Sequence, residues 1–290
     1  MSGSPSPPNR RPHRGEGVLL LPLVLYLVAF LLVPLLLVAA ESLRVSDVAG
    51  TPPFFGLNNY VDCLSDRYGI VLVRSAAYAG TATLACLLLG YPLAYCIAMY
   101  GGRRKNLLLL LVMLPFWTSY LVRIYAWRTL LAGKGFLNTA LLDLGIIHDP
   151  LAILNTPLAV VLGLTYGFLP FMTLPLYTSI EKLDRRLLDA ALDLGAAPLS
   201  AFFRVALPLT LPGVVAGLVL TFIPALGDFV TADLIGGPET QMIGNVIESK
   251  FFIESDWPHG SALAFILMGL LMLGLYLYAR KAQDDGTSAV

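Results

Sequence analysis

Charged residues are scarce in this chain of 290 residues, where Asp, Glu, Lys and Arg together make up 13%. A soluble domain carries roughly 25% charged residues, which form its water-facing surface. Hydrophobic residues reach 57% and the mean hydropathy is +0.75. The formal net charge is zero, so no basic field indicates a nucleic-acid partner. The composition predicts an integral membrane protein whose surface is largely covered by lipid.

Residues that form metal sites and disulfides are also few. The cysteines Cys63, Cys86 and Cys96 form no CxxC pair, and the three histidines lie far apart in the sequence. A disulfide framework or a metal centre is therefore not expected. Gly133-Lys134-Gly135 lacks the upstream glycine and the Ser or Thr of a nucleotide-binding P-loop. We expect a chain without catalytic residues and without a bound cofactor.

Long uncharged runs are what the sequence does contain. A membrane helix needs about 20 apolar residues, and six runs meet or approach that length. They are Val18–Ala40, Ser75–Gly102, Asn106–Val122, Leu151–Ile180, Val205–Gly227 and Gly260–Ala279. We predict an all-α membrane protein with a disordered cytoplasmic tail over residues 1–16, a six-span domain over 17–281 and a second cytoplasmic tail over 282–290.

The positive residues predict the orientation of these spans, because lysine and arginine mark the cytoplasmic side. If both termini are cytoplasmic, the inner segments hold most of the lysines and arginines, including Arg103, Arg104 and Lys105. Trp117 and Tyr120 then lie near the outer end of the third run, where interfacial aromatic residues are common. We expect both termini inside.

The segment between the fourth and fifth runs alternates leucine with charge. It reads EKLDRRLLDAALDLGAAPLSAFFRVALPLTLPG from Glu181 to Gly213. Asp184 suits the N-cap of a short amphipathic helix, Gly195 permits a turn or a close backbone approach, and Pro198 can open a second helix. The exposed apolar ridge predicts either a docking site for a partner or a helix in the lipid interface. The pattern leaves both open.

This segment resembles the signature loop, or EAA motif, of type I ABC importer permeases. In that family Glu-Ala-Ala is followed after three residues by Gly and, nine residues later, by an aliphatic residue, any residue, Leu and Pro. Here the matching positions are Asp189, Ala190, Ala191, Gly195, Val205, Leu207 and Pro208. Asp replaces the Glu of the family, which keeps the carboxylate but shortens its reach by one methylene.

The resemblance implies the fold, the partners and the energy source. It implies a six-helix MetI-like permease bundle in the bacterial inner membrane, whose loop at 181–208 docks on an ATP-binding subunit. ATP and Mg²⁺ would bind that subunit and not this chain. The other implied partners are a second homologous permease subunit, an extracytoplasmic solute-binding protein and membrane lipid. The first span is expected to wrap the partner permease.

Three further stretches indicate the cargo. Leu114–Leu131, Ile223–Ile247 and Asp256–Pro258 are similar to the spermidine and putrescine permease subunits within this family. The resemblance implies a polyamine, although permeases for other small solutes share parts of these stretches. A secondary transporter or channel without an ATPase is the main alternative, but it favours inverted repeats and mid-span charges, and neither is evident here. A membrane enzyme is disfavoured because no catalytic cluster occurs.

Polyamines are flexible polycations, so a path for them favours carboxylates and aromatic faces. The candidate path residues are Asp228, Asp233, Trp117, Tyr120 and Tyr125. The aromatic residues equally suit an interfacial belt, and Asp228 equally suits a helix cap or an ion pair. Arg123 and Arg128 oppose a cationic path, and they either pair with an acid such as Asp228 or contact the binding protein.

Overall fold

The computed structural model describes residues 14–45, 54–64 and 66–287. The chain divides into two compact units. The first comprises Met1–Cys63 and Asp256–Val290, and the second comprises Leu64–Ser255. Most of the predicted tail 1–16 lies outside the described residues, as do residues 288–290 of the predicted tail 282–290.

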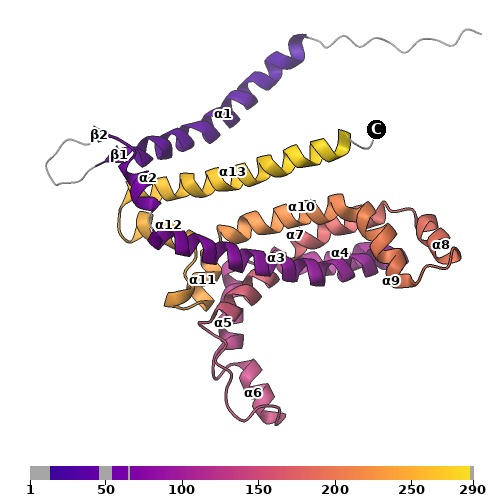
Figure 1. Ribbon diagram of the computed structural model, residues 1–290. Coiled ribbons are helices and arrows are strands. Elements are labelled where there is room, and N and C mark those ends of the chain that lie inside the picture. The colour runs from indigo at the N-terminus through magenta and orange to yellow at the C-terminus, as the bar shows by residue number, and fades with distance from the viewer. Residues whose placement is uncertain (1–13, 46–53, 65, 288–290) are drawn as a thin grey trace, which may run out of the picture. The chain divides into compact units, whose positions relative to one another are not determined.

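The first unit pairs the first and last long helices of the chain. Helix α1 (Arg14–Ser42) and helix α13 (Trp257–Thr287) run antiparallel, and α2 (Asn58–Cys63) packs against α13 (Figure 1). Strands β1 (Arg44–Val45) and β2 (Phe54–Phe55) pair antiparallel, with Arg44 opposite Phe55. The buried Asn59 amide donates to the carbonyl oxygens of Ser42 and Arg44, both at 2.9 Å, and so fixes the chain after α1.

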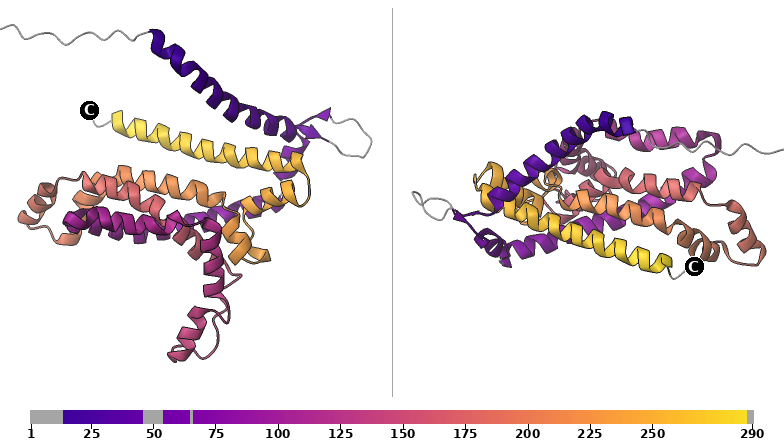
Figure 2. Two further views of the ribbon diagram at one scale, coloured as in Figure 1. Left: turned by 180° about the vertical axis from the view of Figure 1, so that it is seen from behind. Right: turned by 90° about the horizontal axis from the view of Figure 1, so that it is seen from above.

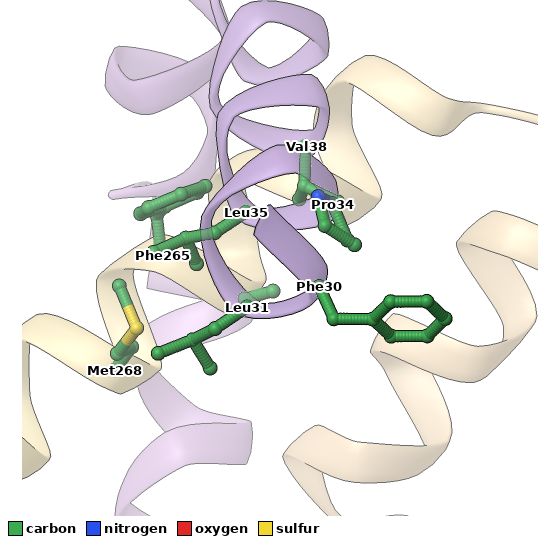
Figure 3. Close-up of a pocket in the computed structure, with 8 residues that line it drawn as sticks. Phe30, Leu31, Pro34, Leu35, Val38, Phe265 and Met268 are labelled. Atoms are coloured by element: carbon green, nitrogen blue, oxygen red, sulfur yellow. The ribbon is translucent and has the colours of Figure 1, made fainter. Parts of the chain in front are cut away.

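Between α1 and α13 lies an apolar groove of about 390 Å³. Leu31 and Leu35 of α1 project toward Phe265 and Met268 of α13, whereas Phe30 projects away from them (Figure 3). Helix α1 is apolar around its whole circumference, which is typical of a helix surrounded by lipid or other apolar helices. The first unit therefore presents two candidate spans.

The second unit holds the other helices. They are α3 (Asp66–Tyr100), η1 (Gly102–Arg104), α4 (Lys105–Met113), η2 (Leu114–Trp117), α5 (Tyr120–Leu131), α6 (Phe136–Asp143), α7 (Pro157–Glu181), α8 (Arg185–Asp193), α9 (Pro198–Ala201), the π-helix η3 (Phe202–Ala206), α10 (Leu207–Leu226), α11 (Val230–Ile235), η4 (Pro238–Thr240) and α12 (Ile243–Phe252). Helices α3, α7 and α10 lie side by side in every view, and α8 extends from one end of them (Figures 1 and 2).

The core of this unit is formed where α3, α7 and α10 meet. Cys86, Ala94, Met172, Leu176 and Ile180 are almost fully buried there. Tyr91 of α3 and Thr210 of α10 share a buried hydrogen bond of 2.7 Å between their hydroxyl groups. Apolar side chains and one buried hydrogen bond therefore hold the three helices together.

Two glycines one turn apart allow α10 to approach α7 closely. A Cβ atom at Gly213 would meet Ser179 Cβ and would lie 2.8 Å from the carbonyl oxygen of Pro175. A Cβ atom at Gly217 would lie 2.6 Å from Met172 Sδ. Small residues four apart are a common means of close helix packing in membranes.

Among the described residues, five helices are long and apolar enough to cross a membrane, or six if one bent pair counts as a single span. The all-α fold class is thus confirmed, and five predicted runs each fall largely within one long helix. Leu151–Asn155, at the start of the fourth run, is not helical. Thr156 explains this, because its hydroxyl accepts from Ala159 N at 3.4 Å and caps α7, with Pro157 in the first turn.

The third run, Asn106–Val122, is not the continuous helix that its apolar sequence predicts. Gly102–Trp117 and Tyr120–Asp143 meet at 87°. Thr118 has an extended backbone conformation, and Ser119 has a non-helical ψ of 137°, so one helical segment ends and the next begins here. Pro115 lies inside the last turn before this break, and the bend places α5 on a different course from α4 (Figure 1).

Replacing Gly213 with Ala should push α7 and α10 apart, because the added methyl group has no space. We expect a destabilisation of about 1–3 kcal/mol, as for other overpacked sites. Gly80→Ala in α3 is the matched control, since its Cβ would meet nothing within 4 Å. Thermal unfolding of both variants in the same detergent tests this, and equal midpoints would contradict the close approach.

Candidate functional site

The loop singled out in the sequence folds as a helix with well-defined ends. Asp184 caps α8, because its carboxylate accepts from Arg186 N at 3.0 Å, as predicted. At the other end Gly195 has φ of +86°, a conformation that L residues rarely adopt. Gly195 N donates to Leu192 O at 2.9 Å and Ala196 N to Ala191 O at 3.1 Å. This is the hydrogen-bond pattern of a Schellman motif, so glycine is required here by the turn.

Leucine side chains form the exposed ridge that the pattern predicted. Leu194 is 89% exposed and Leu199 is 69% exposed, and Leu187 and Leu192 are about half exposed. Asp189 and Ala190 are exposed beside them, while Ala191 is half-buried. A Cβ atom added at Gly195 would have no atom of the described chain within 4 Å beyond this residue and its two chain neighbours, so the space beside it is open. The sequence-predicted docking residues of α8 thus lie together on an accessible surface.

The second half of the signature leads from this surface into a candidate span. Pro198 occupies the first turn of α9, as expected, and α9 continues through the π-helix η3 into α10. Leu207 N donates to Phe202 O, five residues earlier. Leu207 packs against the α3–α7–α10 core, and Pro208 is exposed. Leu207 and Pro208 therefore mark the junction between the loop and α10.

Two polar contacts attach the loop to the helices of the core. The Arg185 guanidinium donates from Nη2 to Ala98 O at 3.0 Å and to Met99 O at 2.6 Å. These carbonyls belong to the last turn of α3. The last carbonyls of a helix have no backbone N–H donor within that helix, so Arg185 supplies one. At the base of the loop, Lys105 of α4 forms an ion pair with Glu181 of α7. Arg185 thus links α8 to the end of α3, and the ion pair links α4 to the end of α7.

A second candidate site is a cavity of about 330 Å³ beside the bend at Thr118. We call it the aromatic cavity, and it is lined by Phe116, Tyr120, Arg123, Gly167, Phe168, Phe171, Pro224, Gly227, Asp228 and Phe229. Five of these side chains are aromatic, one is acidic and one is basic. The cavity brings together Tyr120 and Asp228, two of the predicted path residues.

Asp228 is buried, with 9% of its surface exposed, and its carboxylate is surrounded by donors. Tyr120 Oη donates to Oδ2 at 2.5 Å, and Thr231 Oγ1 donates to the same oxygen. Oδ1 accepts from Val230 N at 2.9 Å and from Thr231 N at 3.3 Å. Asp228 therefore caps the start of α11. Of the alternatives that the sequence left open for Asp228, the helix cap is present, and an ion pair with Arg123 or Arg128 does not occur within the described part of the chain.

Arg123 lies over aromatic rings. Its guanidinium carbon is 4.2 Å from the ring centroid of Phe116 and 5.4 Å from that of Tyr120. Its Nε and Nη1 atoms are buried and have no hydrogen-bond partner among residues 14–45, 54–64 and 66–287. The rings, and not hydrogen-bond acceptors, hold this cation in place.

The other predicted path residues lie outside the aromatic cavity. Asp233 is exposed in the first turn of α11. Trp117 is 75% exposed and Tyr125 is 52% exposed, and neither lines the cavity. Their exposure fits the interfacial belt that the sequence left as the alternative.

Sequence reasoning missed the aromatic role of Phe116, Phe168 and Phe171 and the contacts of Arg123 and Arg185. Phe116 follows Pro115 and precedes the Thr118-Ser119 pair, a combination that signals a helix break. Phe168 and Phe171 lie three residues apart, which places them on one face of α7. The carbonyl acceptors of Arg185 have no sequence signal, because every residue carries one.

Comparison with known proteins places this geometry in a transporter family. Residues 87–287 match the family described as binding-protein-dependent transport system inner membrane component. The chain is 47% identical over 256 residues to the spermidine/putrescine transport system permease protein PotB of Haemophilus influenzae, covering 88% of this chain and 90% of that protein. It is 46% identical over 252 residues to PotB of Escherichia coli K12, covering 86% and 92%.

Solved structures share the fold at lower identity. A bacterial alginate ABC transporter in complex with its alginate-bound periplasmic protein matches with a TM-score of 0.73 at 17% identity, covering 89% of this chain and 90% of the other. The MetNI methionine ABC transporter matches with a TM-score of 0.57 at 16% identity, covering 76% and 98%. By its fold and by the family match over most of its length, this chain belongs to the binding-protein-dependent transport system inner membrane components.

Proposed function

We propose that this chain is a permease subunit of an ATP-driven importer and forms the translocation path for a polyamine, spermidine or putrescine. The observation that carries the proposal is the identity of 45–47% to PotB proteins over most of both chains. The aromatic cavity supports it, because aromatic rings and a carboxylate suit an alkylammonium cargo.

In this proposal the α8 surface docks on an ATP-binding subunit, which binds ATP and Mg²⁺. The ridge of exposed leucines supplies apolar area to bury, and small residues at Ala190, Ala191 and Gly195 permit a close approach. The other partners are a second permease subunit and an extracytoplasmic binding protein. The protein lies in the bacterial inner membrane with both termini in the cytoplasm, because that orientation puts most lysines and arginines inside.

Nucleotide-driven closure of the ATPase subunits moves α8 in this mechanism, and Arg185 carries the motion to α3. The guanidinium holds two carbonyls at the end of α3, so a shift of α8 displaces that helix with it. Leu188, on the same helix, packs against the α3–α7–α10 core. Rigid-body displacement of these spans then alternates access to the path.

Gly195→Val should abolish co-purification with the ATPase subunit, because a β-branched residue cannot adopt the positive φ that ends α8. Gly195→Asn is the matched control, since Asn tolerates this conformation, and it should retain more association than the valine variant. Affinity purification of the complex measures both. Retention of the ATPase by both variants would reject the docking role of this turn.

Arg185→Gln should uncouple ATP hydrolysis from transport, because α8 remains folded and exposed but loses its contact with α3. We expect normal assembly and fewer solute molecules imported per ATP in reconstituted vesicles. Arg186→Gln is the control, because the Arg186 side chain is exposed and donates no hydrogen bond to α3 in the described part of the chain. An unchanged ratio of transport to hydrolysis in Arg185→Gln would show that coupling takes another route.

Cells that express the whole transport system should accumulate labelled spermidine, and Asp228→Asn should reduce that uptake more than assembly. Asn keeps a carbonyl oxygen that can cap α11 but removes the negative charge from the aromatic cavity. Uptake and the amount of assembled complex are measured on the same cells. No spermidine uptake alongside robust uptake of another solute would remove the polyamine assignment, and full uptake by the Asn variant would remove Asp228 from the path.

A further inference from the structure

The aromatic cavity already contains a cation of its own. Arg123 is permanently charged, and its guanidinium carbon lies 4.2 Å from the Phe116 ring centroid and 5.4 Å from that of Tyr120. Both rings line the cavity together with Asp228. Aromatic faces bind a ligand ammonium at such distances as readily as they bind a protein guanidinium. Arg123 thus occupies the position on these rings that suits an amine of the cargo.

The contacts of Arg123 also make it easy to displace. Nε and Nη1 are buried without a hydrogen-bond partner among the described residues, so moving the side chain breaks no hydrogen bond at these atoms. A buried charged group without acceptors is unfavourable, and this residue is only half-buried as a whole. Its side chain therefore gains hydration when it swings out of the cavity.

The carboxylate of Asp228, in contrast, stays in place. Four donors bind it, two from side chains and two from the backbone at the start of α11. One of them is the hydroxyl of Tyr120, the same residue whose ring faces Arg123. Hydrogen bonding to a carboxylate increases electron density on the phenol ring, which strengthens its attraction for a cation. The negative charge of Asp228 therefore strengthens the attraction of the Tyr120 ring for a cation.

We propose that Arg123 is a resident cation, which occupies the seat formed by Phe116 and Tyr120 in the empty protein and yields it to an ammonium group of the cargo. Two cations cannot share the rings, because like charges repel at this distance. The resident cation competes with the cargo and so weakens its binding, and it covers the rings of Phe116 and Tyr120 when cargo is absent. This inference rests on the proposed polyamine function and adds the residue that competes with the cargo.

The test is binding of labelled spermidine to the purified complex of all membrane subunits, without the binding protein. Arg123→Met keeps an unbranched apolar side chain and removes the charged guanidinium, so we expect binding about tenfold tighter. Phe116→Leu removes part of the seat and should weaken binding. Arg123→Lys keeps the charge and should bind spermidine more weakly than Arg123→Met does. Arg128→Met is the matched control on the same helix, outside the cavity, and should leave binding unchanged.

The outcomes separate the two proposals. Tighter binding by Arg123→Met with weaker binding by Phe116→Leu, in complexes that elute as the wild type does, supports the resident cation. Unchanged or weaker binding by Arg123→Met overturns it, and weaker binding shows that Arg123 holds the cargo itself. If Arg123→Met does not assemble, equal binding by Phe116→Leu and wild type overturns the inference. Absence of spermidine uptake by the wild-type system overturns the proposed function and this inference together.

Discussion

Hydrocarbon offers no hydrogen-bond partner to a backbone amide, so a helix that breaks at membrane depth must place its freed groups against protein or water. This chain breaks within its third apolar run, between Trp117 and Tyr120. Helices α7 and α11 pack against α5 beyond the break, and the aromatic cavity opens beside it. The chain meets this constraint locally: Thr118 N and Thr118 Oγ1 both donate to Pro115 O, and Ser119 O accepts from Arg123 N.

Two helices, α7 and α10, run from the loop that carries α8 to the aromatic cavity. α7 lines the cavity with Phe168 and Phe171 and ends at Glu181, which pairs with Lys105 at the base of the loop. α10 contributes Pro224 at one end and begins at Leu207, next to the docking segment, at the other. The close approach at Gly213 ties α7 to α10. A displacement imposed at α8 therefore reaches helices that line the cavity.

Much of this arrangement could be predicted from sequence where one residue type has one physical role. Apolar length identified the long helices, and Asp184, Gly195 and Pro198 defined the ends of the loop helices by capping and backbone conformation. The prediction of one continuous helix over Asn106–Val122 was wrong. Hydropathy measures transfer into lipid and does not report a backbone bend such as that at Thr118. For Asp228 the sequence left a path role, a helix cap and an ion pair open, and the structure shows the cap, because Val230 N and Thr231 N donate to its carboxylate. The hydroxyl of Tyr120 also donates to it, and that partner could not be predicted because it is 108 residues away in the sequence.

The π-helix before α10 has a mechanical consequence. Its wide turn links Leu207 N to Phe202 O, and Pro208 next in line has no N–H to donate. The helical segment from Pro198 to Leu226 thus contains a turn with an incomplete hydrogen-bond ladder, which resists bending less than the regular helix of α10 does. This turn lies between α8, which is the proposed docking helix, and the rest of α10. In the proposed mechanism a displacement of α8 therefore tilts α10, and α10 itself need not unwind.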